Sequence, residues 1–237
     1  MAGHSKWANI QHRKKAQDNK RGKTFTKVIR EITVAAKMGG TDASSNSRLR
    51  LALSKANASN VPKDTVKRAI DKASGQNNEN FEEITYEGYG PKGIAVVVEC
   101  LTDNKNRTVS DLRHVLSKHG GSLGTNGSVS HLFRKVGVMK LNNVTEDDLI
   151  EHMESIELED FEMIHMDCII FTKPTELFST KKYFESKSIE VKDEEIIMDP
   201  LTTIDIPRED SEKISDLSNK IEELDDVQNV YMNSNLL

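Results

Sequence analysis

The sequence is poor in cysteine and aromatic residues, and it contains no long apolar run. Its two cysteines, Cys100 and Cys168, are too few for a disulfide framework, and we expect both to be buried thiols. The longest apolar runs are Ile94–Val98 and Cys168–Phe171, far shorter than the ~20 residues that span a bilayer. The amino-terminal residues lead directly into the basic residues at 12–15, without the apolar stretch of a secretory signal. These absences exclude a disulfide-rich toxin and a helical membrane protein, and they predict a cytoplasmic location.

Motifs for catalysis and metal binding are also missing. Gly22-Lys23-Thr24 resembles the end of a phosphate-binding P-loop, but Gln17 stands where that loop needs its first glycine. His114 and His119 are five residues apart, which does not place them on one helix face, and no zinc-type spacing of Cys or His lies nearby. There is no Gly-x-Ser-x-Gly sequence for a nucleophilic serine. We therefore predict no catalytic residue, no metal site and no cofactor.

Two loops remain open as candidates for function. Asp103–Arg107 follows a predicted strand, where α/β proteins often place functional residues, but a turn with a helix cap explains it equally well. Gly121–Ser128 has spaced glycines whose backbone N–H groups could bind phosphate. It lacks a following helix and a lysine, so a flexible connection between domains is the favoured interpretation. An enzyme that uses both loops is the minor alternative.

The charge is distributed very unevenly along the chain. Residues 1–75 contain 17 Lys+Arg and 5 Asp+Glu, whereas residues 76–237 contain 16 and 33, so net charges of +12 and −17 underlie the overall −5. Such asymmetry is typical of proteins with a nucleic-acid or membrane-surface partner. A solvated helix face and an organelle transit peptide are alternatives. The near absence of acids in the first 30 residues, where Asp18 is the only one, disfavours the first, and a shortage of serine disfavours the second.

The basic residues of this amino-terminal region form the candidate nucleic-acid-binding site. Lysine and arginine neutralise phosphates and release counterions, and a helix over 11–30 would place Lys20, Lys23, Lys27 and Arg30 on one face. Few aromatic side chains are available for base stacking, so we expect binding to depend on backbone charge and shape. The predicted site consists of Lys6, Trp7, His12, Arg13, Lys14, Lys15, Lys20, Arg21, Lys23, Lys27 and Arg30.

Hydrophobic periodicity predicts three helices within residues 23–75 and alternating strands and helices after residue 80. Residues 1–22 have no apolar stripe, so we expect a basic arm with no role in the core. After residue 80 we expect strands at 94–101, 129–133, 137–141, 162–166, 168–172, 189–198, 202–206 and 227–232, and helices at 106–119, 145–156, 174–186 and 208–224.

This order of elements predicts an α+β protein. We expect an N-terminal three-helix domain followed by two ferredoxin-like α/β domains, the third inserted into the second. The predicted boundaries are 1–78 for the basic helical domain with its arm, 79–133 plus 200–237 for the second domain, and 134–199 for the inserted one.

Several segments within about residues 1–133 resemble the YebC/PmpR family. They are residues 1–40, which begin MAGHSKWANI, then Asn57–Ala73, Tyr86–Pro91, Glu99–Asn104 and Gly120–Val129. Ser47 departs from the pattern, which has proline there in many members. The resemblance implies the same three-domain arrangement. It also implies a DNA-binding transcriptional regulator or, as in some members, a translation factor that acts on the ribosome and relieves stalling at proline-rich stretches.

The charge pattern and the resemblance together predict a non-enzymatic, nucleic-acid-binding regulator of gene expression. A DNA-binding transcriptional regulator is the first hypothesis, and a ribosome-binding or rRNA-binding translation factor is the alternative. The expected partners are nucleic acid, either DNA or rRNA within the ribosome, and proteins that contact the acidic α/β domains. We expect no membrane partner.

Overall fold

A computed structural model describes residues 6, 10, 21–74 and 81–236 of this chain, except for the side chains of residues 21, 22, 74 and 236. The described residues divide into two compact units. The larger unit contains Ile10, residues 21–74, residues 81–132 and residues 200–236. The smaller unit contains Lys6 and Phe133–Asp199. Each unit is described by itself.

Three helices form the first part of the larger unit: α2 (Arg21–Gly39), α3 (Ser47–Ala58) and α4 (Lys63–Ser74). Each has one apolar face because its apolar residues recur every three or four positions. These faces meet in a core that includes Ile32 on α2, Leu49 on α3 and Ala69 on α4. Asn46 caps α3, since its side chain accepts a hydrogen bond from Leu49 N at 3.0 Å.

The expectation that residues 1–22 have no role in the core is wrong for Ile10. This side chain is 6% exposed and counts among the buried apolar residues. A single buried isoleucine produces no stripe, so periodicity alone does not detect it.

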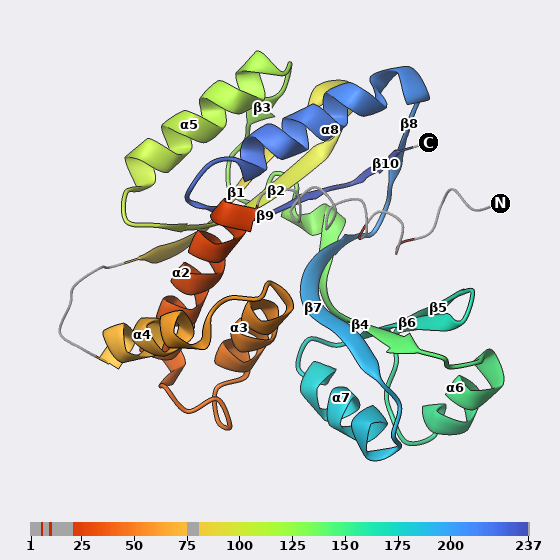
Figure 1. The fold of residues 1–237 in the computed structure, drawn as a ribbon. Coiled ribbons are helices and arrows are strands. Elements are labelled where there is room, and N and C mark those ends of the chain that lie inside the picture. The colour runs from red at the N-terminus through yellow and green to blue at the C-terminus, as the bar shows by residue number, and fades with distance from the viewer. Residues whose placement is uncertain (1–5, 7–9, 11–20, 75–80, 237) are drawn as a thin grey trace. The chain divides into compact units, whose positions relative to one another are not determined.

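The second part of the larger unit is a four-stranded sheet with the order β3-β1-β2-β9 (Figure 1). Its strands are β1 (Glu82–Tyr89), β2 (Ala95–Thr102), β3 (Ser122–Leu123) and β9 (Val227–Met232). The 3₁₀ turns η1 (Pro91–Gly93) and η2 (Ser130–Leu132) and the helices α5 (Lys105–Lys118) and α8 (Arg208–Glu222) complete it. Apolar residues of β2 and β9 pack with Leu112 and Leu116 of α5 and Leu217 of α8. Both helices therefore cover the same face of this sheet.

Two features of this sheet differ from the predicted pattern. The strand at Glu82–Tyr89 was not predicted, because its residues are mostly polar or half-buried, yet it lies in the interior of the sheet, paired with both β2 and β3. The predicted strand at 202–206 does exist as β8 (Ile204–Ile206), but it pairs in parallel with β10 (Ser234–Leu236) in a separate two-stranded sheet.

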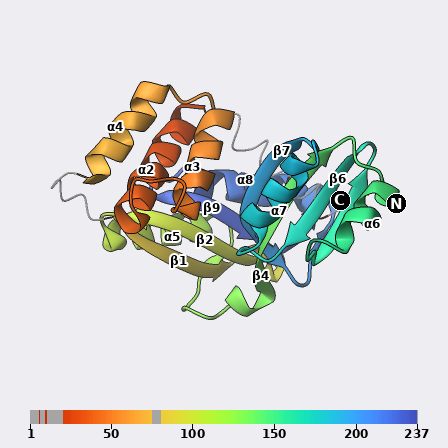
Figure 2. The ribbon, with the colours of Figure 1, turned by 90° about the horizontal axis from the view of Figure 1, so that it is seen from below.

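The smaller unit has the strand and helix order of a ferredoxin-like fold. Its sheet has the order β5-β6-β4-β7, and α6 and α7 lie on one side of it (Figures 1 and 2). The elements are β4 (Phe133–Asn142), α6 (Glu146–Met153), β5 (Asp160–Ile164), β6 (Asp167–Thr172), α7 (Leu177–Ser186) and β7 (Val191–Pro200). Gly137 lets α7 approach the sheet closely, because a Cβ there would lie 3.1 Å from Leu177 Cβ and 2.7 Å from Thr172 Oγ1.

The predicted fold class is confirmed: the chain is an α+β protein with an N-terminal helical region followed by sheet domains. The three domain boundaries given above stay a proposal. Within the described residues, no helix has the length and hydrophobicity needed to cross a membrane.

Candidate nucleic-acid interface

The structure describes only part of the predicted binding site. Six of its residues lie outside the described part of the chain: Trp7, His12, Arg13, Lys14, Lys15 and Lys20. Arg21 begins α2, but its side chain is not described. The positions of Lys6, Lys23, Lys27 and Arg30 can be followed, with Lys6 in the smaller unit and the other three on α2 in the larger one.

The two lysines on α2 are held at the carboxyl-terminal end of α8. Lys23 Nζ donates to Glu223 O at 2.6 Å and lies 3.5 Å from Asp225 Oδ1, while Lys27 Nζ donates to Glu222 O at 2.8 Å. The last carbonyls of a helix have no partner within the helix and lie at the negative end of its dipole. Two ammonium groups therefore stabilise this helix end.

Arg30 enters a cluster of hydrogen bonds around a buried carboxylate, which we call the Asp226 cluster (Arg30, Thr102, Arg107, Thr108 and Asp226). Asp226 is 4% exposed. Its two oxygens accept from Arg30 Nη1 at 3.1 Å, from Arg107 Nη2 at 2.9 and 2.7 Å, and from the hydroxyls of Thr102 and Thr108 at 3.0 and 2.8 Å. Arg30 Nη1 also donates to Leu101 O and to Asp225 O.

Asp226 remains ionised in this cluster. Burial raises the pKa of its carboxyl, but the hydrogen bonds from Arg107, Thr108 and Thr102 outweigh burial, and the net shift in pKa is downward. The hydrogen bonds of Arg107 to Asp226 and Asp103 raise the pKa of Arg107. The Asp226 cluster joins α2 to the four-stranded sheet of the larger unit. Lys23, Lys27 and Arg30 therefore all donate to carbonyl or carboxylate oxygens of their own unit. A phosphate would have to replace those oxygens to bind them.

A second group of cations, on α4, was not part of the predicted site. Lys63, Lys67 and Arg68 are exposed, and their side chains have no hydrogen-bond or ion-pair partner among the residues that the structure describes. The opposite face of α4 packs Val66, Ala69 and Ile70 into the helical core. Lys63–Ser74 contains four basic residues and two acidic ones, and this excess of positive charge was visible in the sequence.

The Gly121–Ser128 loop and its flanking residues do bind an anion, but it is a side chain of the protein itself. The Glu87 carboxylate accepts hydrogen bonds from the backbone N–H groups of Gly127 at 2.7 Å, Val129 at 2.7 Å and Ser130 at 2.8 Å. The loop is thereby fixed to β1, and it is not the flexible connection that the sequence favoured. The same bonds explain why residues 130–132 form a 3₁₀ turn, so that the strand predicted at 129–133 begins only at Phe133.

Replacing Glu87 with glutamine is expected to lower the free energy of unfolding by about 2 kcal/mol, because a charge-assisted acceptor of three backbone N–H bonds is lost. Burial raises the pKa of Glu87, but the hydrogen bonds from its three N–H donors lower it by more, so the net pKa lies below the ordinary 4.5. The carboxylate therefore stabilises the fold above pH 4.5, and this contribution is lost as the pH falls through the lowered pKa.

Urea unfolding of both proteins over a pH series measures this effect. The difference between wild type and E87Q should be constant above pH 4.5 and shrink below it. Glu82→Gln is the control on the same strand, since its carboxylate is 58% exposed and pairs with Lys105. An E87Q protein as stable as wild type at neutral pH would contradict the assignment.

The Asp103–Arg107 loop is a turn with a helix cap. Asn104 caps α5 by accepting from Arg107 N at 3.1 Å, and Arg107 bridges Asp103 and Asp226. Both cysteines are buried, and burial raises the pKa of each thiol to about 12. Among the described residues, no group of three or more His, Cys, Asp or Glu side chains is placed to hold a metal ion.

Comparison with known proteins gives consistent matches over the whole chain. Residues 5–76 match the family model described as the TACO1/YebC protein N-terminal domain, and residues 81–234 match the TACO1/YebC second and third domain. A probable transcriptional regulatory protein of Idiomarina loihiensis is 47% identical over 239 residues, covering 100% of this chain and 96% of that protein. One of Pseudomonas fluorescens is 49% identical over 240 residues, with the same coverage. The crystal structure of a conserved hypothetical protein from Aquifex aeolicus is also similar, with a TM-score of 0.81 and 41% identity over 92% of this chain and 91% of that one.

Proposed function

This chain belongs to the TACO1/YebC family, and from that premise we propose that it is a nucleic-acid-binding regulator of gene expression whose target is DNA. The relatives are named probable transcriptional regulatory proteins, which supports a role in regulation. The observation on which the nucleic-acid target rests is the exposed basic face of α4, formed by Lys63, Lys67 and Arg68.

The α4 face is suited to phosphate for two reasons. Its cations have no partner among the described residues, so binding a phosphate breaks no interaction described within the protein. They also belong to the segment of the chain with a net charge of +12, which attracts a polyanion from a distance. We assign the predicted basic residues at 6–30 to the same function, as contacts that add to those of α4.

Replacing Lys63 and Lys67 with alanine should weaken binding to a short DNA duplex by roughly 10- to 100-fold, because each lost phosphate contact removes about one unit from the slope of log K against log salt. The matched control is Arg113→Ala with Lys118→Ala, which removes two equally exposed charges from α5. It should change affinity by much less. Equal effects of the two double variants would show that α4 is not the interface.

The same titrations with an rRNA fragment of equal length decide between the two nucleic acids. Tighter binding of DNA supports the proposal. If the rRNA fragment binds more tightly and only its binding depends on Lys63 and Lys67, the target is RNA, and a role in translation replaces the role in transcription.

A further inference from the structure

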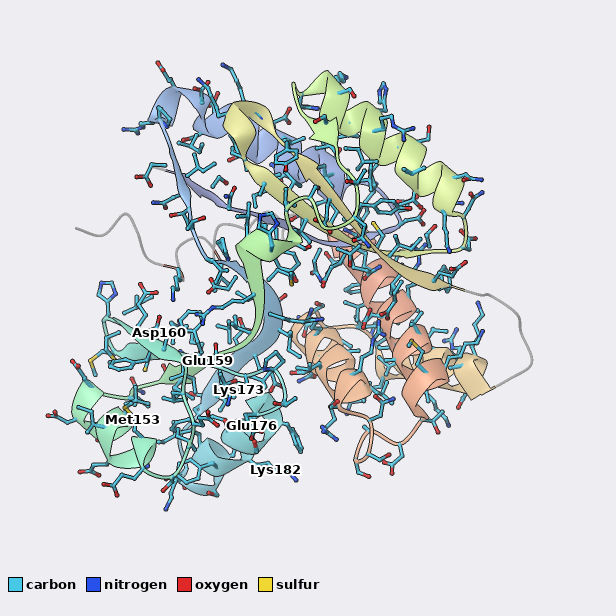
Figure 3. The ribbon with its side chains drawn as sticks, turned by 180° about the vertical axis from the view of Figure 1, so that it is seen from behind. Met153, Glu159, Asp160, Lys173, Glu176 and Lys182 are labelled. Atoms are coloured by element: carbon cyan, nitrogen blue, oxygen red, sulfur yellow. The ribbon has the colours of Figure 1, made fainter. Side chains whose placement is uncertain are left out.

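One face of the sheet in the smaller unit has an acidic site whose occupant is a lysine of the same protein. Asp160 of β5 lies opposite Phe171 of β6, and Phe171 lies opposite Val138 of β4, so these three side chains share a face. The adjacent residue Gly137 faces α7, so this is the face that α7 does not cover. Figure 3 labels Asp160, the first residue of β5, and Glu159, which precedes it.

Lys6 is seated on this face by two contacts. Its Nζ donates to Asp160 Oδ2 at 2.6 Å and lies 5.1 Å from the centroid of the Phe171 ring. The ring thus contributes a cation–π contact beside the ion pair. Partial burial raises the pKa of Asp160, but the hydrogen bond and the charge of Lys6 lower it more, so the carboxyl stays ionised.

The described residues around Lys6 have an excess of negative charge. Arg134 donates from Nε to Asp199 at 3.2 Å and from Nη1 to Glu159 at 3.2 Å. Among the described residues, three carboxylates at Glu159, Asp160 and Asp199 therefore face one arginine, and Lys6 supplies the second positive charge. Asp199 is 4% exposed, and burial raises its pKa while Lys6 opposes that rise. Without a cation at the position of Lys6, this buried carboxylate would be poorly compensated.

We propose that Asp160, Phe171 and Asp199, here called the Lys6 site, bind a lysine of a basic chain segment, and that their occupant is the protein's own amino-terminal segment, held through Lys6 in competition with nucleic acid. This inference rests on the proposed function, because Lys6 is also one of the predicted phosphate contacts. One ammonium group cannot neutralise Asp160 and a phosphate at once. The Lys6 site therefore lowers the affinity for nucleic acid.

The contacts of Lys6 are weak enough to be broken and formed again reversibly. The side chains of Lys6 and Asp160 are 40% and 46% exposed. A partly exposed ion pair together with a cation–π contact to the buried ring of Phe171 changes an equilibrium by roughly 5- to 30-fold. A polyanion that binds several other cations at the same time can displace such an interaction.

The first measurement follows Lys6 in the free, full-length protein and needs no nucleic acid. Lys6 is acetylated with a small amine-reactive reagent, and its rate is compared with that of Lys118 by mass spectrometry. Replacing Asp160 with asparagine should raise the Lys6 rate by roughly 2- to 5-fold, because a partly exposed ion pair is lost. Asparagine keeps an oxygen that can accept the hydrogen bond from Phe161 N, so the start of β5 is preserved. An unchanged rate would overturn the proposed site.

The second measurement is the affinity for a short DNA duplex at moderate salt. D160N should bind roughly 2- to 5-fold more tightly than wild type, because the ion pair is lost while the contact of Lys6 with Phe171 remains. Glu151→Gln is the matched control, because it removes the same charge from an exposed position on α6 of the same unit. If both variants gain affinity equally, general electrostatics explains the gain, and the competition is refuted.

The two measurements separate failure of this inference from failure of the proposed function. If wild type, D160N and E151Q all fail to bind DNA and RNA, the proposed function and the competition are wrong, while the acetylation rate still decides whether the Lys6 site exists. If DNA binds but D160N behaves as E151Q, the proposed function stands and only the competition is wrong.

Discussion

Replacing Asp226 with alanine is expected to lower the free energy of unfolding of the larger unit by about 3 kcal/mol, the lower end of the range for breaking a buried ion pair. Asp226 is 4% exposed and accepts hydrogen bonds from two arginines and two threonines. Without it, the guanidinium of Arg30 keeps no carboxylate partner among those described, only two carbonyl oxygens and the ring of Phe81. Arg107 is 47% exposed and can be rehydrated, which is why we place the loss at the lower end.

Chemical unfolding of D226A, followed by a probe in the larger unit, checks this value. Asp103→Ala is the control, because Asp103 also pairs with Arg107 but is 55% exposed, and its loss should cost less than about 1 kcal/mol. Since the pKa of Asp226 is lowered, its contribution is present above the ordinary value of 3.8 and is lost as the pH falls through the lowered pKa. A D226A protein within experimental error of wild type would show that the cluster does not stabilise the fold.

Replacing Arg13, Lys14 and Lys15 together with alanine should weaken nucleic-acid binding on the order of 100- to 1000-fold near 0.1 M salt. Each lost phosphate contact costs nearly tenfold at that salt concentration, because fewer counterions are released. These residues lie outside the described part of the chain, so this prediction rests on the sequence alone. The loss should be uniform across sequences, because phosphates are the same at every position of the duplex.

Salt titration distinguishes this effect from misfolding. If six to nine phosphates are engaged, log K for wild type should fall with log salt at a slope of roughly −5 to −8, and the triple variant should lose about 3 units of that slope. A matched variant that replaces Arg113, Lys118 and Lys135, all exposed, with alanine should keep the wild-type slope. Wild-type affinity in the triple variant would refute the assignment of the arm.

Periodicity located the helices because the apolar repeat and the capping residues of a helix lie within a short stretch of sequence. Each apolar face recurs every three or four residues, and Asn46, Thr145 and Asn104 cap the helices that follow them. The strand β1 escaped prediction because its residues are mostly polar and its two buried residues are Glu87 and Gly88. The burial of Glu87 is explained only by the tertiary structure, in which the N–H groups of Gly127, Val129 and Ser130 donate to its carboxylate.

For the candidate site, too, the sequence and the tertiary structure supplied different information. The sequence identified the basic amino-terminal region from its charge, but it offered no reason to separate Lys27 from Lys67. In the structure, Lys27 is bound to the carbonyl of Glu222, whereas Lys67 is exposed without a partner among the described residues. The four basic residues of α4 are visible in the sequence, but nothing there distinguishes them from a solvated helix face.

The sequence by itself determined the helix-forming segments, most of the strands, the concentration of positive charge before residue 76 and the family to which the chain is similar. Each of these depends on composition or on residues close together in the chain. Only the tertiary structure decided which cations are already engaged. Lys23 and Arg30 meet partners about 200 residues away, and Lys6 meets Asp160 across 154 positions. Such pairings depend on how the whole chain folds, and no local pattern of charge or hydrophobicity specifies them.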